Sequence, residues 1–476
     1  MNELTISLKT DSKIPLYEQI YDYIKSNIRQ GKIPCGEKLP STRALSRHLD
    51  VSRSTVELAY EQLLSEGYLE SEPCRGYFAA RIENLYCLDV DKNPAGEENV
   101  RLPQTAGETP EQKKFHYDFT PNGVDVGSFP YQVWRKLSKD VLLDDRTELF
   151  RAGDTRGEEG FRRAICSYLY QARGVECAPD QIVIGAGNDY MLMLLCAILG
   201  TGKKLAFEDP AYMQAYRLFS CLSYETVPVP VDKNGMQVEA LMLTDAEVAY
   251  VTPSHQYPTG AVMPVGRRQE LLKWADGGEE RYIIEDDYDS EFRYKGKPIP
   301  ALQGMDARGK VIYLGTFSRS VAPAIRLSYM VLPPALLRKY EAKNRFIHST
   351  VSKVDQRIME RFLEEGYYER HLNKTRALYK SRHDALIDAL KPLSGICRIS
   401  GEYAGVHLLL HFREDRKEED LIRQAEEAGI RVYGLNDYRI CQPARKEPVI
   451  LLGYANLSEQ EIREAAEILA ECWGKM

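Results

Sequence analysis

Carboxylates and aromatic residues follow an apolar run in the second half of the chain. Residues 282–292 read YIIEDDYDSEF, which is typical of a buried strand that ends in acids. We expect Asp286 and Tyr288 at the carboxyl edge of a sheet, where open α/β sheets bind their ligands. There a carboxylate can hold the proton of a pyridinium nitrogen, and a phenol can hydrogen-bond a ring oxygen. The alternative is a turn aspartate beside a core tyrosine.

Two further segments carry groups that suit a phosphate and an aromatic ring. GAGND, residues 185–189, follows an apolar run and precedes a helical pattern, so its glycines allow an anion to approach backbone N–H groups. Gly187 and Asn188 are therefore candidates for binding a phosphate. Tyr212, in the segment EDPAY, offers a ring face for stacking, although it could also be a core aromatic.

The segment 315–329 reads GTFSRSVAPAIRLSY and carries hydroxyls and two arginines. Ser318 and Arg326 suit the same phosphate, although Arg326 could instead pair with a core carboxylate. The guanidinium of Arg319 is a permanent cation in proteins, so it cannot serve as a nucleophilic amine. It can hold a carboxylate bidentately. Arg439, in NDYRICQP, is a second candidate for a ligand carboxylate.

A separate group of basic and hydroxyl residues lies near the N-terminus. Residues 39–68 read LPSTRALSRHLDVSRSTVELAYEQLLSEGY, which predicts helices at 42–49 and 53–66 joined by a three-residue turn. This is the pattern of a helix-turn-helix whose second helix reads DNA, followed by a hairpin wing. The candidate DNA contacts are Ser41, Arg43, Arg53, Ser54, Thr55 and, in the wing, Arg75. The alternative is an amphipathic cap with solvated arginines, in which Thr55 packs against the first helix.

Composition limits the possible partners and compartments. The 476 residues carry a net charge of −7, so any contact with double-stranded DNA needs a local basic patch. Residues 38–53 provide one, with four Lys or Arg residues against a single aspartate. The ten cysteines show no zinc-type spacing, so we expect reduced thiols and no metal site. With no signal peptide and no apolar run of about 18 residues, we expect a cytoplasmic protein without a membrane span.

The order of patterns predicts two domains and a linker. Residues 1–80 form the helical unit with its hairpin, residues 81–117 read as a polar linker, and residues 118–476 form an α/β unit. Strand-like runs alternate with helical patterns there, which predicts a mostly parallel sheet covered by helices. The last hundred residues, with apolar runs at 405–411, 431–433 and 449–454, predict a smaller α+β part.

These motifs resemble the MocR-type regulators, in which a GntR winged helix is fused to a fold-type I aminotransferase-like domain that binds pyridoxal phosphate (PLP). The resemblance covers nearly the whole chain and includes LPSTRALS, VSRSTV, AYEQLLSEGYL, RGYF, GDTRGEEGFRRAICSYL, SHQYPTG and LLGYANLSEQEI. It implies that Asp286 pairs with the pyridinium and Tyr288 with the phenolic oxygen. It also implies that Tyr212 stacks on the ring and that Ser318 and Arg326 hold the phosphate. It further implies a head-to-tail homodimer, an operator with two half-sites and a small-molecule effector.

The chain departs from the family pattern at two positions. Arg319 stands where the family has its Schiff-base lysine, so the resemblance implies no catalytic residue there and only non-covalent PLP, if PLP is bound. GAGND replaces the usual phosphate turn with a Ser or Thr, so backbone N–H groups and Asn188 must do more. Three hypotheses stay open. They are a regulator that senses PLP, an amino-acid–PLP adduct or a related carboxylate through Arg319 and Arg439; a regulator whose pocket is empty and only supports dimerisation; and a working aminotransferase.

Overall fold

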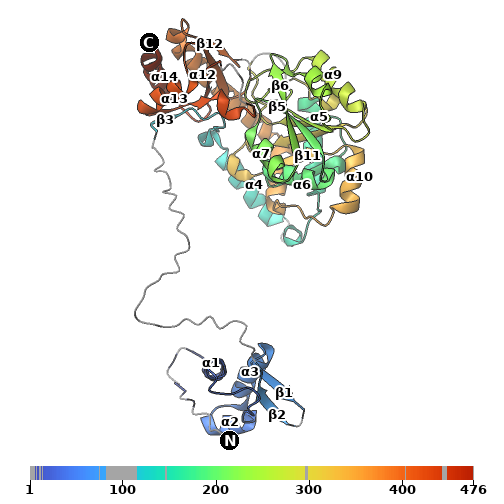
Figure 1. Cartoon of the computed structure of the whole chain (residues 1–476), viewed down its shortest axis with the longest axis vertical. Helices are drawn as coiled ribbons and strands as arrows, with labels where there is room; N and C mark the ends of the chain where they lie inside the picture. Colours follow the sequence, from blue (N-terminus) through green and yellow to red (C-terminus); the bar gives the residue numbers. More distant parts are fainter. Residues whose placement is uncertain are drawn as a thin grey trace. The chain divides into compact units, whose positions relative to one another are not determined.

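The computed structural model describes residues 6, 8–9, 12, 14–73, 75–81, 115–144, 147–294, 299–402, 404–441 and 447–474. The chain divides into two compact units, residues 1–108 and residues 109–476. In Figure 1 the described part of the first unit is blue, and that of the second runs from cyan to red. Most of the linker predicted at 81–117 lies outside the described residues. No helix within the described ranges is long and apolar enough to cross a membrane.

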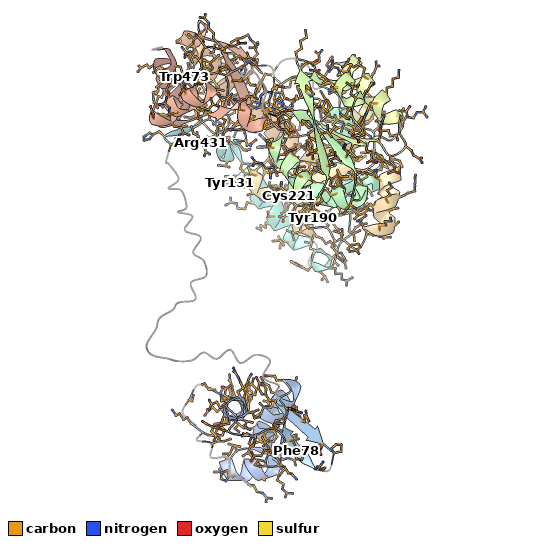
Figure 2. The ribbon with its side chains drawn as sticks, in the orientation of Figure 1. Phe78, Tyr131, Tyr190, Cys221, Arg431 and Trp473 are labelled. Carbon is orange, nitrogen blue, oxygen red and sulfur yellow. The ribbon has the colours of Figure 1, made fainter. Side chains whose placement is uncertain are left out.

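The first unit is a three-helix bundle with a two-stranded wing. Its elements are α1 (Leu16–Arg29), α2 (Thr42–Leu49), α3 (Arg53–Ser65), β1 (Leu69–Glu72) and β2 (Gly76–Ala79). The strands pair antiparallel, with Leu69 opposite Ala79. Apolar side chains from all five elements, among them Ile24, Val56 and Tyr60, form one buried cluster. Figure 2 labels Phe78 on the second wing strand.

Side-chain caps fix where the helices of this unit begin. The Ser41 hydroxyl accepts a hydrogen bond from the Ala44 N–H, and the Ser52 hydroxyl accepts one from the Thr55 N–H, both at 3.2 Å. Each cap satisfies a backbone donor that has no partner in the first turn. The sequence prediction of these two helix starts is confirmed.

An eight-stranded mixed sheet forms the centre of the second unit, in the order β4-β11-β10-β9-β8-β5-β6-β7. The four pairs from β10 to β6 are parallel, whereas β11 runs antiparallel to both of its neighbours. The bounds are β4 Ile182–Gly185, β5 Lys204–Asp209, β6 Glu225–Asp232, β7 Gly235–Met236, β8 Val248–Val251, β9 Tyr282–Asp287, β10 Val311–Thr316 and β11 Ser328–Val331.

Helices cover both faces of this sheet because alternate residues of each strand point to opposite sides. On β10, Ile312 and Leu314 pack in one apolar cluster with α6 (Asn188–Leu199), α7 (Met213–Cys221) and α10 (Pro334–Lys343). Val311 and Tyr313 point to the other face. The helices there are α5 (Glu159–Arg173), α8 (Val238–Met242), α9 (Val265–Asp276) and α11 (Lys353–Glu364). The predicted α/β class is confirmed.

A smaller α+β part completes the second unit. Its sheet has the order β12-β13-β16-β15, with α12, α13 and α14 against it. The bounds are α12 Tyr367–Ala389, β12 Cys397–Ser400, β13 His407–Phe412, α13 Glu418–Glu427, β15 Tyr433–Gly434, β16 Val449–Gly453 and α14 Glu459–Gly474. The apolar run at 431–433 is divided between two strands. β14 (Ile430–Arg431) pairs with β3 (Tyr117–Asp118), whereas β15 joins the four-stranded sheet.

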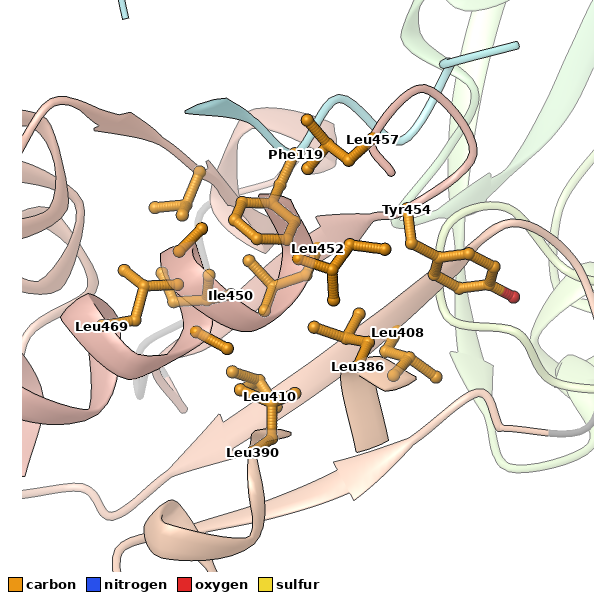
Figure 3. Packing of buried hydrophobic residues seen from close by; sticks show 14 of the residues in the cluster. Phe119, Leu386, Leu390, Leu408, Leu410, Ile450, Leu452, Tyr454, Leu457 and Leu469 are labelled. Carbon is orange, nitrogen blue, oxygen red and sulfur yellow. The ribbon is translucent and has the colours of Figure 1, made fainter. Parts of the chain in front are cut away.

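The start of the second unit is built into this smaller part. Strand β3 pairs with β14, the strand that follows α13 in the smaller part, and the next residue, Phe119, is completely buried. Figure 3 shows Phe119 in the apolar cluster with Leu452 and Leu457, residues more than 300 positions away in the chain. The segment that follows the linker is therefore anchored in the smaller part.

Candidate functional site

One pocket gathers seven of the sequence-predicted residues. They come from loops and strand ends at the carboxyl edge of the sheet, after β4, β5, β9 and β10, whose parallel directions bring those ends together. The residues lining the pocket are Asn188, Asp189, Tyr212, Gln214, Thr252, Tyr257, Asp286, Tyr288, Thr316, Ser318, Arg319 and Arg326.

Asp286 is the buried carboxylate of this pocket. Its Oδ2 accepts a hydrogen bond from the Tyr250 hydroxyl and another, at 3.4 Å, from the Asn188 side-chain amide. Burial raises the pKa of Asp286 to about 6, although the bonds from Tyr250 and Asn188 favour the charged form. A cationic group placed beside this carboxylate would stabilise its ionised form, as a protonated ring nitrogen does.

Tyr288 presents its hydroxyl beside a buried histidine–aspartate pair. His255 Nδ1 lies 2.9 Å from the Tyr288 hydroxyl and 2.9 Å from Asp289 Oδ2. A buried carboxylate beside Nδ1 favours a proton on that nitrogen, so the Tyr288 hydroxyl keeps its own proton for another acceptor. Burial also raises the pKa of Tyr288 well above its ordinary value, so this residue is a neutral donor at pH 7.

The other end of the pocket has the groups that suit a phosphate. The Ser318 Oγ is buried and has no hydrogen-bond partner among the described residues. Arg326 adopts a left-handed backbone conformation, with φ of 49°. Gly187 lies against it, since a Cβ on that glycine would come within 2.2 Å of the Arg326 Nη2. Arg326 also forms an ion pair with Asp189, with 2.9 Å between Nη2 and Oδ2.

Arg319 reaches across the pocket to the start of the second unit. Its Nη1 donates to the Pro121 carbonyl at 3.2 Å, and its Nη2 donates to the Asn122 Oδ1 at 2.5 Å. Its guanidinium carbon lies 5.3 Å from the ring centroid of Tyr288, a cation–π distance. The guanidinium is therefore fixed at the Tyr288 side of the pocket.

Two predicted site residues lie outside the pocket lining, and one has a different contact from the expected one. Gly187 contributes through its closeness to Arg326. Arg439 follows the short helix Leu435–Tyr438, and its Nε is buried without a partner among the described residues. Asn188 was expected at the phosphate end. Its amide instead donates to Asp286, and it is the Asp189 side chain of this turn that pairs with Arg326.

Sequence reasoning missed several residues that line the pocket or contact its lining. Asp189 and Tyr257 occur in segments that were recognised, GAGND and SHQYPTG, but their side chains were not assigned. Tyr250 lies within an apolar strand, so its bond to Asp286 had no signal in the sequence. Asn122 follows the predicted linker, and nothing in its neighbourhood indicated a contact with Arg319.

The predicted DNA-contacting residues lie on the surface of the winged-helix unit, except that Thr55 is half-buried. Arg43 has no ion-pair partner among the residues described, whereas Arg53 Nε lies 2.7 Å from Glu57 Oε1 on the same helix. Arg75 likewise contacts Glu72 within the wing. The Ser54 and Thr55 hydroxyls both lie within hydrogen-bond distance of the Ser52 hydroxyl. Exposed pairs of this kind contribute at most about 1 kcal/mol, so a phosphate can replace the carboxylate.

Family models match both units. The model for bacterial regulatory proteins of the gntR family matches residues 16–78. The model for aminotransferase class I and II matches residues 121–469. Among solved structures, the multiple substrate aminotransferase of Thermococcus profundus is 26% identical, with a TM-score of 0.68 over 76% of this chain and 92% of that one.

Full-length relatives share the whole arrangement. The uncharacterized HTH-type transcriptional regulator YdeL of Bacillus subtilis is 38% identical over 99% of both chains. The probable rhizopine catabolism regulatory protein MocR of Rhizobium meliloti is 30% identical over 97% of this chain and 94% of its own. The chain therefore belongs to the MocR-type family of transcriptional regulators, in which a GntR-type winged helix precedes an aminotransferase class I and II domain.

Proposed function

We propose that this regulator binds PLP, an amino-acid–PLP adduct or a related carboxylate ligand in the pocket without a covalent bond, and that it does not catalyse transamination. The observation that carries the proposal is the position of Arg319. Its guanidinium lines the same pocket as Asp286, Ser318 and Arg326, at the position where the family has its attachment lysine. A permanent cation cannot form the covalent link, but it can bind a carboxylate.

The described residues fit PLP. Asp286 would hold the ring nitrogen, and the Tyr288 hydroxyl would donate to the ring oxygen. The unpartnered Ser318 hydroxyl and the Arg326 guanidinium would hold the phosphate in the space that Gly187 leaves free. When bound, the cofactor supplies an aldehyde and an electron-withdrawing ring. The side chains of the pocket bind and orient it, and Arg319 supplies a cation for a carboxylate.

Backbone strain supports a retained binding site. Arg326 has a φ of 49°, which a residue with a Cβ rarely adopts and which costs on the order of 1 kcal/mol. The conformation places the Arg326 guanidinium against Gly187, and any side chain at residue 187 would collide with it. A domain that served only for dimerisation would have no need of this arrangement.

A second candidate, an empty pocket, is supported by Asp189. Its carboxylate already pairs with Arg326 and accepts a hydrogen bond from Gln214 at 2.6 Å, so it opposes a phosphate at that end. The third candidate, a working aminotransferase, lacks the required amine at residue 319. An experiment that restores the lysine separates the candidates.

The Arg319→Lys variant should capture PLP covalently, whereas the wild-type protein should not. We expect a visible absorbance band during titration of the variant with PLP. Borohydride reduction should then leave a pyridoxyl group on residue 319, as shown by peptide mapping. Arg151→Lys, a change at an exposed ion pair with Glu148, is the matched control and should behave as wild type. A well-folded variant that captures nothing would favour the empty pocket, and a single stoichiometric adduct on any lysine of the wild-type protein would contradict non-covalent binding.

We further propose that the second unit forms a homodimer that delivers two winged helices to two half-sites of double-stranded DNA. Five large apolar side chains are at least 47% exposed between residues 126 and 150, namely Val126, Tyr131, Leu142, Leu143 and Phe150. Three of them lie on α4 (Tyr131–Asp144), where Figure 2 labels Tyr131. An apolar group of this kind is typical of a protein interface.

Introducing charged side chains into this apolar group should dissociate the dimer into monomers. We expect Tyr131→Glu combined with Phe150→Glu to give a monomer by light scattering, because each buried charge would lack a partner. Leu243→Glu is the matched control, since Leu243 is equally apolar and 91% exposed after α8. A dimer that persists in the double variant would contradict this interface.

A further inference from the structure

The residues after the linker connect the smaller α+β part to the pocket. Phe119 is anchored in the apolar cluster of the smaller part, and its carbonyl accepts a hydrogen bond from the Gly453 N–H at 2.8 Å. Two and three residues later, the Pro121 carbonyl and the Asn122 side chain accept the two hydrogen bonds from Arg319. A short segment is therefore fixed to the smaller part at one end and to the pocket at the other.

The contacts of Arg319 occupy the edge that a carboxylate would use. A carboxylate binds a guanidinium bidentately through two N–H groups, and the Nη1–Nη2 pair is one of the two edges available. In this structure Nη1 faces the Pro121 carbonyl and Nη2 faces the Asn122 Oδ1. Both acceptors are neutral, so a carboxylate is the stronger partner for the cation. Stacking on Tyr288 keeps the guanidinium in place whichever acceptor it has.

We propose that Arg319 is a latch, which holds residues 121–122 against the pocket until a ligand carboxylate takes its guanidinium. Release from Arg319 removes two of the hydrogen bonds that hold residues 121–122 at the pocket, while the Tyr257 hydroxyl still donates to the Asn122 Oδ1 at 3.3 Å. The proposal rests on the proposed function only in that a carboxylate-bearing ligand binds this pocket.

The contact itself is testable without a ligand. If Arg319 holds the segment, Arg319→Ala in the full-length protein should raise the hydrogen-exchange rates of amides in residues 119–125 at least several-fold. The matched control is Arg151→Ala, which removes an exposed arginine whose ion pair is with Glu148, outside this segment, and it should leave these exchange rates unchanged. Unchanged exchange in Arg319→Ala would overturn the latch, whether or not any ligand binds.

The competition is testable with two probes. N-(5′-phosphopyridoxyl)-L-leucine carries a carboxylate, and pyridoxamine 5′-phosphate does not. The bond between Arg319 and Asn122 must break before a ligand carboxylate can bind the guanidinium. Removing the Asn122 acceptor should therefore raise the affinity for a ligand that carries a carboxylate. We expect Asn122→Ala to bind the leucine adduct about 3- to 10-fold more tightly than wild type and pyridoxamine phosphate equally well. Asn122→Asp, which gives Arg319 a carboxylate of its own, should weaken adduct binding by a similar factor.

The outcomes separate the latch from the proposed function. Adduct binding that weakens in Asn122→Ala would make Asn122 a ligand-binding residue and overturn the latch. If Asn122→Ala gained the same affinity for both probes, the ligand carboxylate would not be competing with Asn122 for the guanidinium, and this part of the proposal would be overturned. If neither probe binds wild type at all, the proposed function fails. The exchange experiment then still decides whether Arg319 holds the segment.

Discussion

The arginines of the winged helix and those of the pocket are held in different ways. Arg53 is 65% exposed and pairs with Glu57, four residues along the same helix. Arg319 contacts Asn122, which is 197 positions away in the sequence. The first pair is local and screened by water, so its carboxylate is exchanged for a phosphate at little free-energy cost. The second joins two parts of the fold, so breaking it changes the tertiary structure around the pocket.

This difference assigns separate tasks to the two units. The side chains predicted to contact DNA need no rearrangement to do so, because helix caps and the apolar cluster already fix α2 and α3. The pocket, by contrast, contains charges in interlocking contacts, with Asp286 bonded to Tyr250 and Asn188. A ligand that enters must exchange some of these contacts for its own. In the proposed function, the pocket therefore binds the ligand and the winged helix reads DNA.

The largest effect should come from the exposed arginines. If Arg43 and Arg53 contact base edges or phosphates, alanine at each should cost about 1–3 kcal/mol of DNA-binding free energy, and the double variant roughly the sum. Gel-shift titrations with the protein's own promoter measure this loss. The salt dependence of affinity should also fall by about one unit of slope per phosphate contact removed.

Arg29→Ala is the control for this double variant. Arg29 is exposed at the end of α1, outside the helix-turn-helix pair, and should leave the affinity within experimental error. Unchanged affinity with both Arg43 and Arg53 replaced would refute the assignment of the DNA-binding surface.

A smaller loss of binding free energy is expected when the buried carboxylate of the pocket is neutralised. Asp286→Asn keeps the shape of the side chain but removes the negative charge that would hold a protonated ring nitrogen. We expect PLP to bind about 10- to 100-fold more weakly, which is the usual worth of a charged hydrogen bond. Equilibrium dialysis measures the loss, and Asp276→Asn on the exposed end of α9 serves as the control. Equal PLP affinity in wild type and Asp286→Asn would remove this residue from the site.

The same variant should be more stable without ligand, with a defined pH dependence. Burial raises the pKa of Asp286 to about 6, whereas an unfolded aspartate has a pKa near 3.9. The native state then binds more protons between these values, so the free energy of unfolding falls as pH rises through them. Removing the charge should therefore increase the free energy of unfolding by about 1–3 kcal/mol at pH 8 and by much less at pH 4. Denaturant unfolding at both pH values tests this, and an equal gain at both would exclude ionisation as the cause.

The smallest effect should come from a helix cap. Ser52→Ala removes the acceptor for the Thr55 N–H and should destabilise α3 by about 0.5–2 kcal/mol. Hydrogen exchange of the α3 amides measures this change in the intact protein. Ser65→Ala, at the opposite end of the same helix, is the control. Faster exchange in Ser65→Ala than in Ser52→Ala would mean that the cap is not what stabilises the start of α3.

The sequence alone determined the features that depend on neighbours along the chain. The Ser41 and Ser52 caps, the helices after them and most strands of the large sheet follow from local periodicity and capping. The candidate pocket residues could also be proposed, because parallel strands end at the same edge of a sheet and the motifs resemble a known family. The absence of an amine at Arg319 is likewise a property of one residue type.

Only the tertiary structure decided which groups meet across the fold. Phe119 packs with Leu452, Tyr250 donates to Asp286, and Arg319 donates to Asn122, through contacts that no local pattern encodes. The split of residues 430–434 between two sheets has the same origin, because a distant strand, β3, supplies the partner for β14. The direction of a side chain in a buried network depends on every group around it. The hydrogen bond from the Asn188 amide to Asp286 could therefore be found only in the folded structure.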